Sequence, residues 1–210
     1  MSFRVSPAYA QSVAQLRTAL RNRPGRRVLG LDVGSYFVGL ALSDASNMTA
    51  QPLASLKRAV KIDANNQPVH RKITKLELET KSFRRQSVPF SSIAGVLAAY
   101  MQQYNVAALC VGFPYTVDGR TDHAQSDIKQ FVQQLQTSPQ LQRTPVFVWD
   151  ESFSSQAASD RLRASAGPAH PNTGGMGRTW TARKQQSDMH AAAGILQEFL
   201  DYMRSLPATP

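Results

Sequence analysis

Residues 28–44, VLGLDVGSYFVGLALSD, constrain what this chain can fold into more than any other stretch. Two apolar runs flank Gly34–Tyr36, a pattern that predicts two antiparallel strands joined by a turn. Asp32 lies inside the first run. A carboxylate in apolar surroundings is costly unless it is paired or binds a metal, so Asp32 is a candidate ligand. The alternative is a turn carboxylate that faces water where the strand ends.

The rest of the chain alternates helix and strand patterns. Strands are expected at 51–56, 106–113 and 144–151, and helices at 90–104, 124–136, 154–166 and 187–203. The segment 72–83 alternates polar and apolar residues, as in an edge strand or the second arm of a hairpin. A hairpin and a third strand, followed by alternating helices and strands, predict an α/β fold with a mixed sheet and helices on both faces.

Charge narrows the choice of partners. A net charge of +10 favours nucleic acid. The alternative is a basic organellar or ribosome-associated protein whose charge serves no single site. No stretch approaches the roughly 18 continuous apolar residues of a membrane helix, so no membrane partner is expected. The single cysteine, Cys110, lies in an apolar run and is expected to be a buried core residue in a reducing compartment.

One domain is expected over residues 28–204, with a basic insertion at about 57–88 and a tail at 205–210. Residues 1–27 carry six arginines and no acidic residue, and Val13, Leu16 and Leu20 recur there at helical spacing. This pattern is typical of a transit peptide and predicts delivery to the mitochondrial matrix. The alternative is a basic helix that docks on RNA, in a cytoplasmic protein.

Three further acidic residues fall where ligands bind in such sheets. Asp150 and Glu151 end the last strand, and Asp188 is expected in the first turn of the final helix. Strand ends and helix starts meet along one edge, so these carboxylates would converge with Asp32. Mg²⁺ or Mn²⁺ would relieve their repulsion, and two such ions support phosphodiester cleavage. Taken singly, Ser187 or Asp188 is by default an ordinary helix cap, and Asp150 and Glu151 start toward opposite faces of the strand.

Basic residues near these acids are candidates for holding phosphates. Residues 167–186, rich in glycine, proline and basic residues, are expected to form a mobile loop. That loop carries Arg178, Arg183 and Lys184, and Arg120 lies in the expected loop after the strand at 106–113. We expect these four side chains to bind backbone phosphates by charge. The alternative is plain solvation of the loops.

Five segments form an ordered series: LGLDVGSYFVGLALSD, QPL, LCVGFPYTVDGRTDHAQ, VFVWDESFSSQAA and KQQSDMHAAAGILQEFL. The series covers most of residues 28–203 and resembles the motifs of the YqgF/RuvX family of Holliday-junction resolvase-like or pre-16S rRNA nucleases. The resemblance implies an RNase H-like fold and metal-dependent cleavage of structured nucleic acid. It implies that Asp32, Glu151 and Asp188 are the catalytic metal ligands, with Asp150 as a candidate fourth ligand.

The resemblance also implies roles around the hairpin. Gly34 would let the chain turn sharply, Ser35 keeps the hydroxyl of the family's threonine, and Gly39 would fit the return strand close against the first strand. The sequence departs from the family pattern at Ser152, which replaces an arginine, and at Gln186, which replaces a lysine. It also has Phe-Ser-Ser at 153–155 where the family has Leu-Ser-Thr.

Two functions are consistent with these residues. The first is a Mg²⁺- or Mn²⁺-dependent endonuclease for structured RNA or branched DNA, with rRNA or precursor rRNA and ribosomal or assembly proteins as partners. The second is a catalytically weak or inactive RNase H-like fold that binds RNA as a (mito)ribosome assembly factor. The departure at Ser152, the arginine-rich N-terminus and the basic insertion favour it, whereas the presence of all three acids argues against it. A lysine or arginine that fills the metal position would support the second function. Junction cleavage would require a symmetric homodimer.

An actin-like ATPase shares the opening DxG[ST] hairpin. That fold encloses its nucleotide between two lobes, and a chain of 210 residues with no second such hairpin is too short for it.

Overall fold

The computed structural model describes residues 7–35, 37–58, 61–62, 68–69, 93–114, 123–150 and 176–207. Five strands form one mixed sheet: β1 (Arg27–Val33), β2 (Phe37–Ser43), β3 (Ala50–Lys57), β6 (Val106–Phe113) and β7 (Val146–Asp150). Their order is β3-β2-β1-β6-β7. β1, β2 and β3 are antiparallel neighbours, whereas β6 and β7 run parallel to β1. The short strands β4 (Lys61–Ile62) and β5 (Pro68–Val69) pair with each other in a separate ribbon.

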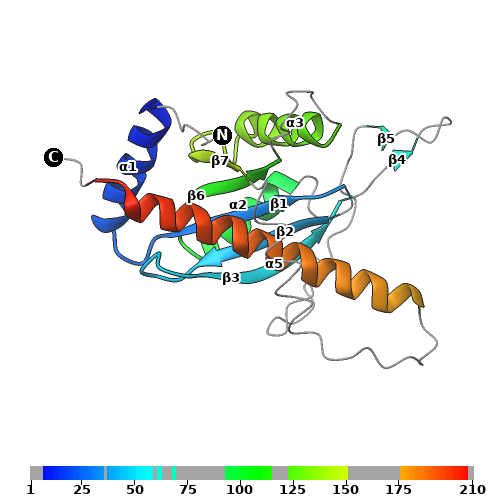
Figure 1. Cartoon of the computed structure of the whole chain (residues 1–210). Helices are drawn as coiled ribbons and strands as arrows, with labels where there is room; N and C mark the ends of the chain where they lie inside the picture. Colours follow the sequence, from blue (N-terminus) through cyan, green and yellow to red (C-terminus); the bar gives the residue numbers. More distant parts are fainter. Residues whose placement is uncertain are drawn as a thin grey trace.

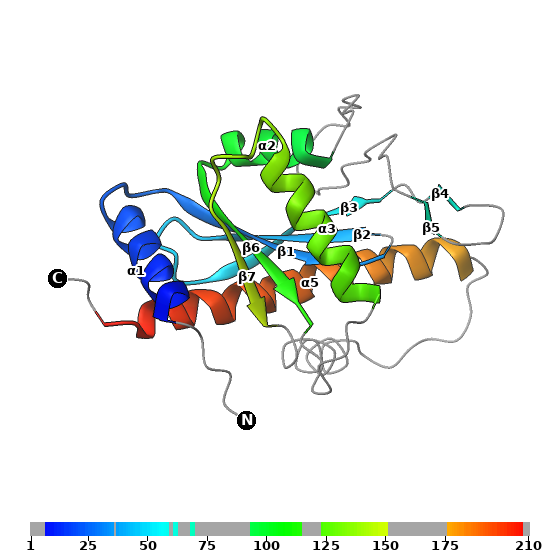
Figure 2. The same cartoon turned by 90° about the horizontal axis from the view of Figure 1, so that it is seen from above.

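The described helices are α1 (Pro7–Arg21), α2 (Ile93–Gln103), α3 (His123–Thr137) and α5 (Met176–Ser205). α5 crosses one face of the sheet, and α2 and α3 cover the other (Figures 1 and 2). The expected α/β fold, a mixed sheet with helices on both faces, is confirmed. The helix expected at 154–166 and the strand expected at 72–83 lie outside the described residues. No helix in the described ranges is both long and apolar enough to cross a membrane.

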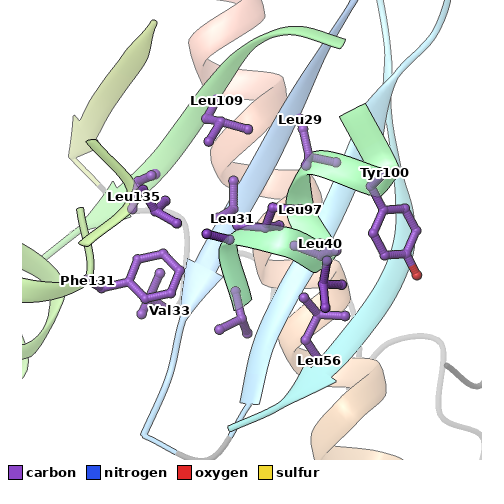
Figure 3. Close-up of a cluster of buried hydrophobic side chains, with 14 of the residues drawn as sticks. Leu29, Leu31, Val33, Leu40, Leu56, Leu97, Tyr100, Leu109, Phe131 and Leu135 are labelled. Carbon is purple, nitrogen blue, oxygen red and sulfur yellow. The ribbon is translucent and has the colours of Figure 1, made fainter. Parts of the chain in front are cut away.

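Alternation along β1 divides the core into two layers. Leu29, Leu31 and Val33 are buried in the layer formed with α2 and α3 (Figure 3). Val28 is buried in the other layer, formed with α5, and so is Cys110 of β6, which is the buried core residue that the sequence predicts. β1 therefore has apolar packing on both faces along most of its length, and its one acidic residue, Asp32, lies next to its end at the hairpin.

α1 packs into this second layer. Its predicted apolar face, Val13, Leu16 and Leu20, is buried there. Arg17 is 6% exposed and donates from its guanidinium to backbone oxygens at the end of α5, namely those of Met203, Leu206 and Pro207. Residues 7–21 of the expected N-terminal extension are thus packed against the domain, while the transit-peptide role stays a prediction.

α5 begins well before the helix that the sequence predicts. Residues 176–186 are helical, so the loop expected at 167–186 is wrong over this part. Ala182, Arg183, Lys184 and two glutamines propagate a helix easily, and they outweigh the glycine-rich stretch before them. Asp188 consequently lies near the middle of α5 rather than in a first turn, which excludes the helix-cap interpretation of this residue.

Candidate active site

Asp32 and Asp188 are brought to the same face of the sheet by a glycine. Asp32 lies near the end of β1 and pairs with Gly39 across the hairpin. Residues directly opposite each other in an antiparallel pair direct their side chains to one face. At Gly39 that face is covered by α5, since an added Cβ would lie 2.0 Å from the backbone oxygen of Asp188. The sequence predicted close packing at Gly39 against the first strand, and the structure shows that α5 is the close neighbour.

The carboxyl group of Asp188 is buried beside Lys184, one turn earlier in α5. The Nζ of Lys184 lies 2.6 Å from Oδ1 of Asp188, and the two side chains are 45% and 4% exposed. Burial raises the pKa of the Asp188 carboxyl, while the hydrogen bond and charge of Lys184 act in the opposite direction. The second oxygen, Oδ2, is buried and has no hydrogen-bond partner among the described residues. Such an oxygen is costly to bury and is the atom that a bound cation would satisfy.

The end of β7 supplies the next predicted acid. Gly112 of β6 pairs with Trp149, and the Trp149 indole donates to Glu198 of α5 at 3.3 Å. Trp149 therefore faces α5, and alternation places Asp150 on the opposite face, toward the layer of Val148. The structure brings Asp32 and Asp188 together and does not bring Asp150 to them. Glu151 follows Asp150 and lies outside the described residues.

A complete metal centre is not present in the described part of the chain. No group of three or more His, Cys, Asp or Glu side chains that could hold a metal occurs there. Two of the predicted ligands, Asp32 and Asp188, are described, and the third, Glu151, is not. Carboxylate oxygens are the donors that Mg²⁺ and Mn²⁺ prefer, and the unpartnered Oδ2 of Asp188 suits such an ion. The described donors therefore fit a hard divalent cation but need a further ligand.

Arg58 is a site residue that sequence reasoning missed. It follows β3, is 7% exposed, and donates to both carboxylate oxygens of Asp127 in α3, at 2.9 and 3.2 Å. It also donates to the backbone oxygen of Gly34 at 2.8 Å. Arg58 thus ties the hairpin turn, two residues after Asp32, to α3. In the sequence Arg58 belongs to the basic insertion, and its place directly after an apolar strand is the signal that sets it apart.

The chain turns at Gly34, whose backbone N–H donates to the oxygen of Phe37 at 2.9 Å. Gly34 does not adopt left-handed backbone, and the described glycine that does is Gly25, with a φ of 83°. A Cβ added at Gly34 would lie 3.1 Å from the oxygen of Phe37, so local crowding favours glycine there. Ser35 is exposed in the turn. The hairpin is therefore held by contacts around Gly34 rather than by its conformational freedom.

The predicted phosphate-binding residues lie in different environments. Arg178, Arg183 and Lys184 are on α5 rather than in a loop, and the side chains of the two arginines are not among those described. Lys184 is paired with Asp188. Arg120 lies outside the described residues. Their phosphate contacts stay predictions.

Comparisons with known proteins show to which family this chain belongs. The family model of RuvX, described as "Holliday junction resolvase", matches residues 70–202. A protein of Bacillus mycoides (strain KBAB4) named "Putative pre-16S rRNA nuclease" is 32% identical over 83% of this chain and 98% of its own length. A protein of the same name from Gluconobacter oxydans (strain 621H) is 33% identical over 88% of this chain and 91% of its own length.

Among solved structures, Thermus thermophilus RuvC in complex with a Holliday junction substrate aligns with 85% of this chain and 96% of its own. The identity is 13% and the TM-score 0.40. The family match over more than half of the sequence, together with relatives above 30% identity along most of its length, shows that the chain belongs to the RuvX family.

Proposed function

We propose that this protein is a metal-dependent endonuclease for structured nucleic acid, with rRNA or its precursor as substrate. The observation that carries the proposal is the placement of Asp32 beside a buried Asp188 through the Gly39 contact. The substrate class is supported by the names of the relatives and by the net charge of +10.

Asp32 and Asp188 would hold Mg²⁺ or Mn²⁺ between the hairpin and α5, with Glu151 as the third ligand. Such an ion supplies an activated water and charge stabilisation at the phosphodiester when bound. Lys184 would then exchange its partner, because its ammonium group is half exposed and can turn from Asp188 to a substrate phosphate. We propose the same phosphate-binding role for Arg120, Arg178 and Arg183. Asp150, on the far face, is the weakest candidate of the predicted ligands.

The contact between Lys184 and Asp188 is also the one observation that favours a second function. An ammonium group 2.6 Å from Oδ1 takes a position that a cation would otherwise use. A chain in which that pair is permanent would bind RNA as an assembly factor without turnover. The unpartnered Oδ2 of Asp188 and the exposure of Lys184 favour the nuclease.

Cleavage of a labelled rRNA precursor and of a four-way DNA junction, each with Mg²⁺ and with Mn²⁺, tests the proposal. We expect metal-dependent cleavage of the RNA by the wild type and a loss of at least 100-fold in Asp32→Asn and in Asp188→Asn. The matched control is Asp201→Asn, an exposed acid paired with Arg204 near the end of α5, which should cleave like the wild type. If the protein binds RNA but cleaves it under none of these conditions, the nuclease proposal is wrong and the assembly-factor function is supported. Cleavage of the junction alone would move the substrate to DNA and call for a homodimer.

We also propose the mitochondrial matrix as the place of action, with the arginine-rich residues 1–27 as an address that stays on the protein, because Val13, Leu16 and Leu20 of this segment are buried in the core. The alternative is the cytoplasm. Imaging of the full chain with a fluorescent protein at its C-terminus, and of residues 1–27 alone fused to the same fluorescent protein, distinguishes them.

A further inference from the structure

Four arginines gather at the end of the molecule away from the carboxylates. Arg21 ends α1, Arg23 and Arg26 follow in the connection, and Arg27 begins β1. Arg21 and Arg23 are exposed, and Arg26 and Arg27 are partly buried. We call residues 21–27 the arginine loop.

Hydrogen bonds from the connection between β2 and β3 hold the backbone of the arginine loop in place. The amide nitrogen of Asn47 donates to the backbone oxygen of Arg26 at 2.8 Å. Ser43 donates from its hydroxyl to Oδ1 of Asn47 at 2.7 Å and accepts from the backbone N–H of Val28 at 2.9 Å. Ser43 and Asn47 are both buried. This chain of hydrogen bonds joins the loop to the first residues of the sheet.

A second asparagine holds the loop from the connection between α2 and β6. Asn105 accepts from the backbone N–H of Arg27 at 3.1 Å, and its side chain donates to the oxygen of Gly25 at 3.4 Å. Asn47 and Asn105 both adopt left-handed backbone, with φ of 55° and 54°, and Gly25 has a φ of 83°. All three residues thus have left-handed backbone angles, which residues other than glycine and asparagine rarely adopt, and together they fix one short loop.

The charges that the loop presents are not neutralised within the described structure. None of its four guanidinium groups forms an ion pair with a described acid. Asp44, in the connection that also carries Asn47, has its carboxylate engaged by the backbone N–H groups of Met48 and Thr49 and by the hydroxyl of Ser46. A fixed loop with unneutralised guanidinium groups is suited to bind a polyanion with little loss of loop entropy.

The structure also argues against a membrane as that polyanion. A basic helix binds a lipid surface by burying its apolar face among the acyl chains. In α1 that face, with Val13, Leu16 and Leu20, is already buried in the protein core. The guanidinium group of the neighbouring Arg17 is hydrogen-bonded to backbone oxygens at the end of α5. What remains available is the cluster of charges alone, which matches the phosphate backbone of a nucleic acid.

We propose that the arginine loop is a second RNA-binding site, which grips the phosphate backbone of a structured RNA away from the carboxylates. β1 separates the loop from Asp32, and five residues of extended strand span about 17 Å. A short duplex at the carboxylates would not reach the loop, whereas a longer RNA would contact both. The inference takes RNA as the ligand from the proposed function, and it does not require that the protein cleaves.

The test measures the RNA affinity of the triple variant Arg21→Gln/Arg23→Gln/Arg26→Gln by fluorescence anisotropy, at salt concentrations from about 50 to about 300 mM. On a structured RNA of about 40 base pairs we expect at least a tenfold loss of affinity and a salt slope smaller by about 2. On a hairpin with a stem of about 4 base pairs, which is shorter than the distance from Asp32 to the loop, and in metal-dependent cleavage of that hairpin, we expect wild-type behaviour.

The matched control is Arg21→Lys/Arg23→Lys/Arg26→Lys, which keeps the charges and should stay within about threefold of the wild type on the long RNA. Unchanged affinity of the glutamine variant for the long RNA would overturn the inference, and so would an equal loss in the lysine variant. Equal losses on both RNA lengths would place the effect at the carboxylates and overturn it as well. If the wild type binds the long RNA through the loop but never cleaves, the proposed nuclease fails and this site stands.

Discussion

At the residue scale, the main feature of the candidate site is the buried carboxylate of Asp188, one oxygen of which has no hydrogen-bond partner among the described residues. Burial raises the pKa of Asp188, and Lys184 compensates only in part. The folded state therefore holds the proton of Asp188 more tightly than the unfolded chain does. Stability from this group is present at low pH and is lost as pH rises from the ordinary value of 3.8 through the higher folded pKa. At neutral pH, metal-free protein bears the cost of an ionised, buried Asp188.

Asp188→Asn should consequently raise the melting temperature of the metal-free protein by a few degrees at pH 7, because the amide carries no charge to bury. The advantage should shrink as the pH is lowered toward 4, where wild-type Asp188 takes up its proton. Thermal unfolding across this pH range, in the presence of a chelator, measures it. Asp201→Asn, at an exposed ion pair, should show no such trend. A lower melting temperature of Asp188→Asn at pH 7 would mean that the Lys184 pair outweighs the burial cost.

Gly39 makes the second residue-scale prediction. A Cβ there would collide with the backbone of Asp188, at 2.0 Å from its oxygen, and a backbone carbonyl cannot rotate away as a side chain can. Gly39→Ala should cost about 3 kcal/mol of unfolding free energy, measured in urea, and should weaken Mn²⁺ binding by displacing α5. Gly25→Asn is the control, since its added Cβ meets nothing within 4 Å and asparagine tolerates its φ. Wild-type stability of Gly39→Ala would contradict the seating of α5 on the hairpin.

At this scale the sequence could predict the carboxylates and the glycine that bring the site together, because both follow from short motifs. It could not predict Arg17 and Arg58. Each is a buried cation whose partners, the end of α5 and Asp127, are distant in the chain and are chosen only by the packing of helices.

At the scale of elements, α1 is a structural helix, and one buried arginine connects it to the end of α5. Arg17 satisfies backbone oxygens at the end of α5, where a helix leaves its last carbonyl groups without intrahelical partners. Tyr9 donates to the oxygen of Val148 at 2.9 Å and so also ties α1 to β7, an edge strand of the sheet. α1 therefore joins the two ends of the chain and covers part of a sheet edge.

Arg17→Met should lower the unfolding free energy by about 2–3 kcal/mol, because it removes charged donors from buried carbonyl groups while keeping the apolar stem. The control is Arg21→Met, at an exposed position one turn later, which should stay within about 0.5 kcal/mol. Denaturant unfolding of the two variants compares them directly. Equal and small effects would show that α1 is held by its apolar face alone.

The elements also show where sequence reasoning reaches its limit. The strands β1, β2, β3, β6 and β7 and the helices α2 and α3 follow from apolar periodicity, which burial in the sheet and its covering layers dictates. The early start of α5 does not, because glycine and proline before it signal a loop while helix propensity in residues 182–186 signals a helix. That conflict is settled by propagation from a helix already anchored on the sheet.

At the scale of the whole molecule, the described chain ends around the basic insertion lie toward the candidate site. β3 runs parallel to β1 and stops at Lys57, and α2 starts at Ile93, at the end of the sheet where β3 stops (Figure 2). The insertion therefore leaves and rejoins the domain on the side of Asp32, opposite to the arginine loop. The described β4–β5 ribbon pairs only within itself. A nucleic acid that reaches from the arginine loop to the candidate site would therefore come close to the points where the insertion leaves and rejoins the domain.

Replacing residues 59–92 by a linker of about twelve glycine and serine residues should leave the fold intact, because the described core residues outside this segment already pack both faces of the sheet. The replacement removes seven basic and three acidic residues, that is +4 of the net +10. We expect melting within a few degrees of the wild type and a loss of affinity for long RNA that fades at high salt. Combined with the glutamine variant of the arginine loop, the two free-energy losses should add, since the two segments share no residue and the described ends of the insertion lie at the opposite end of the sheet from the loop. A combined loss well below that sum would mean that one RNA segment exchanges between the two surfaces instead of spanning them.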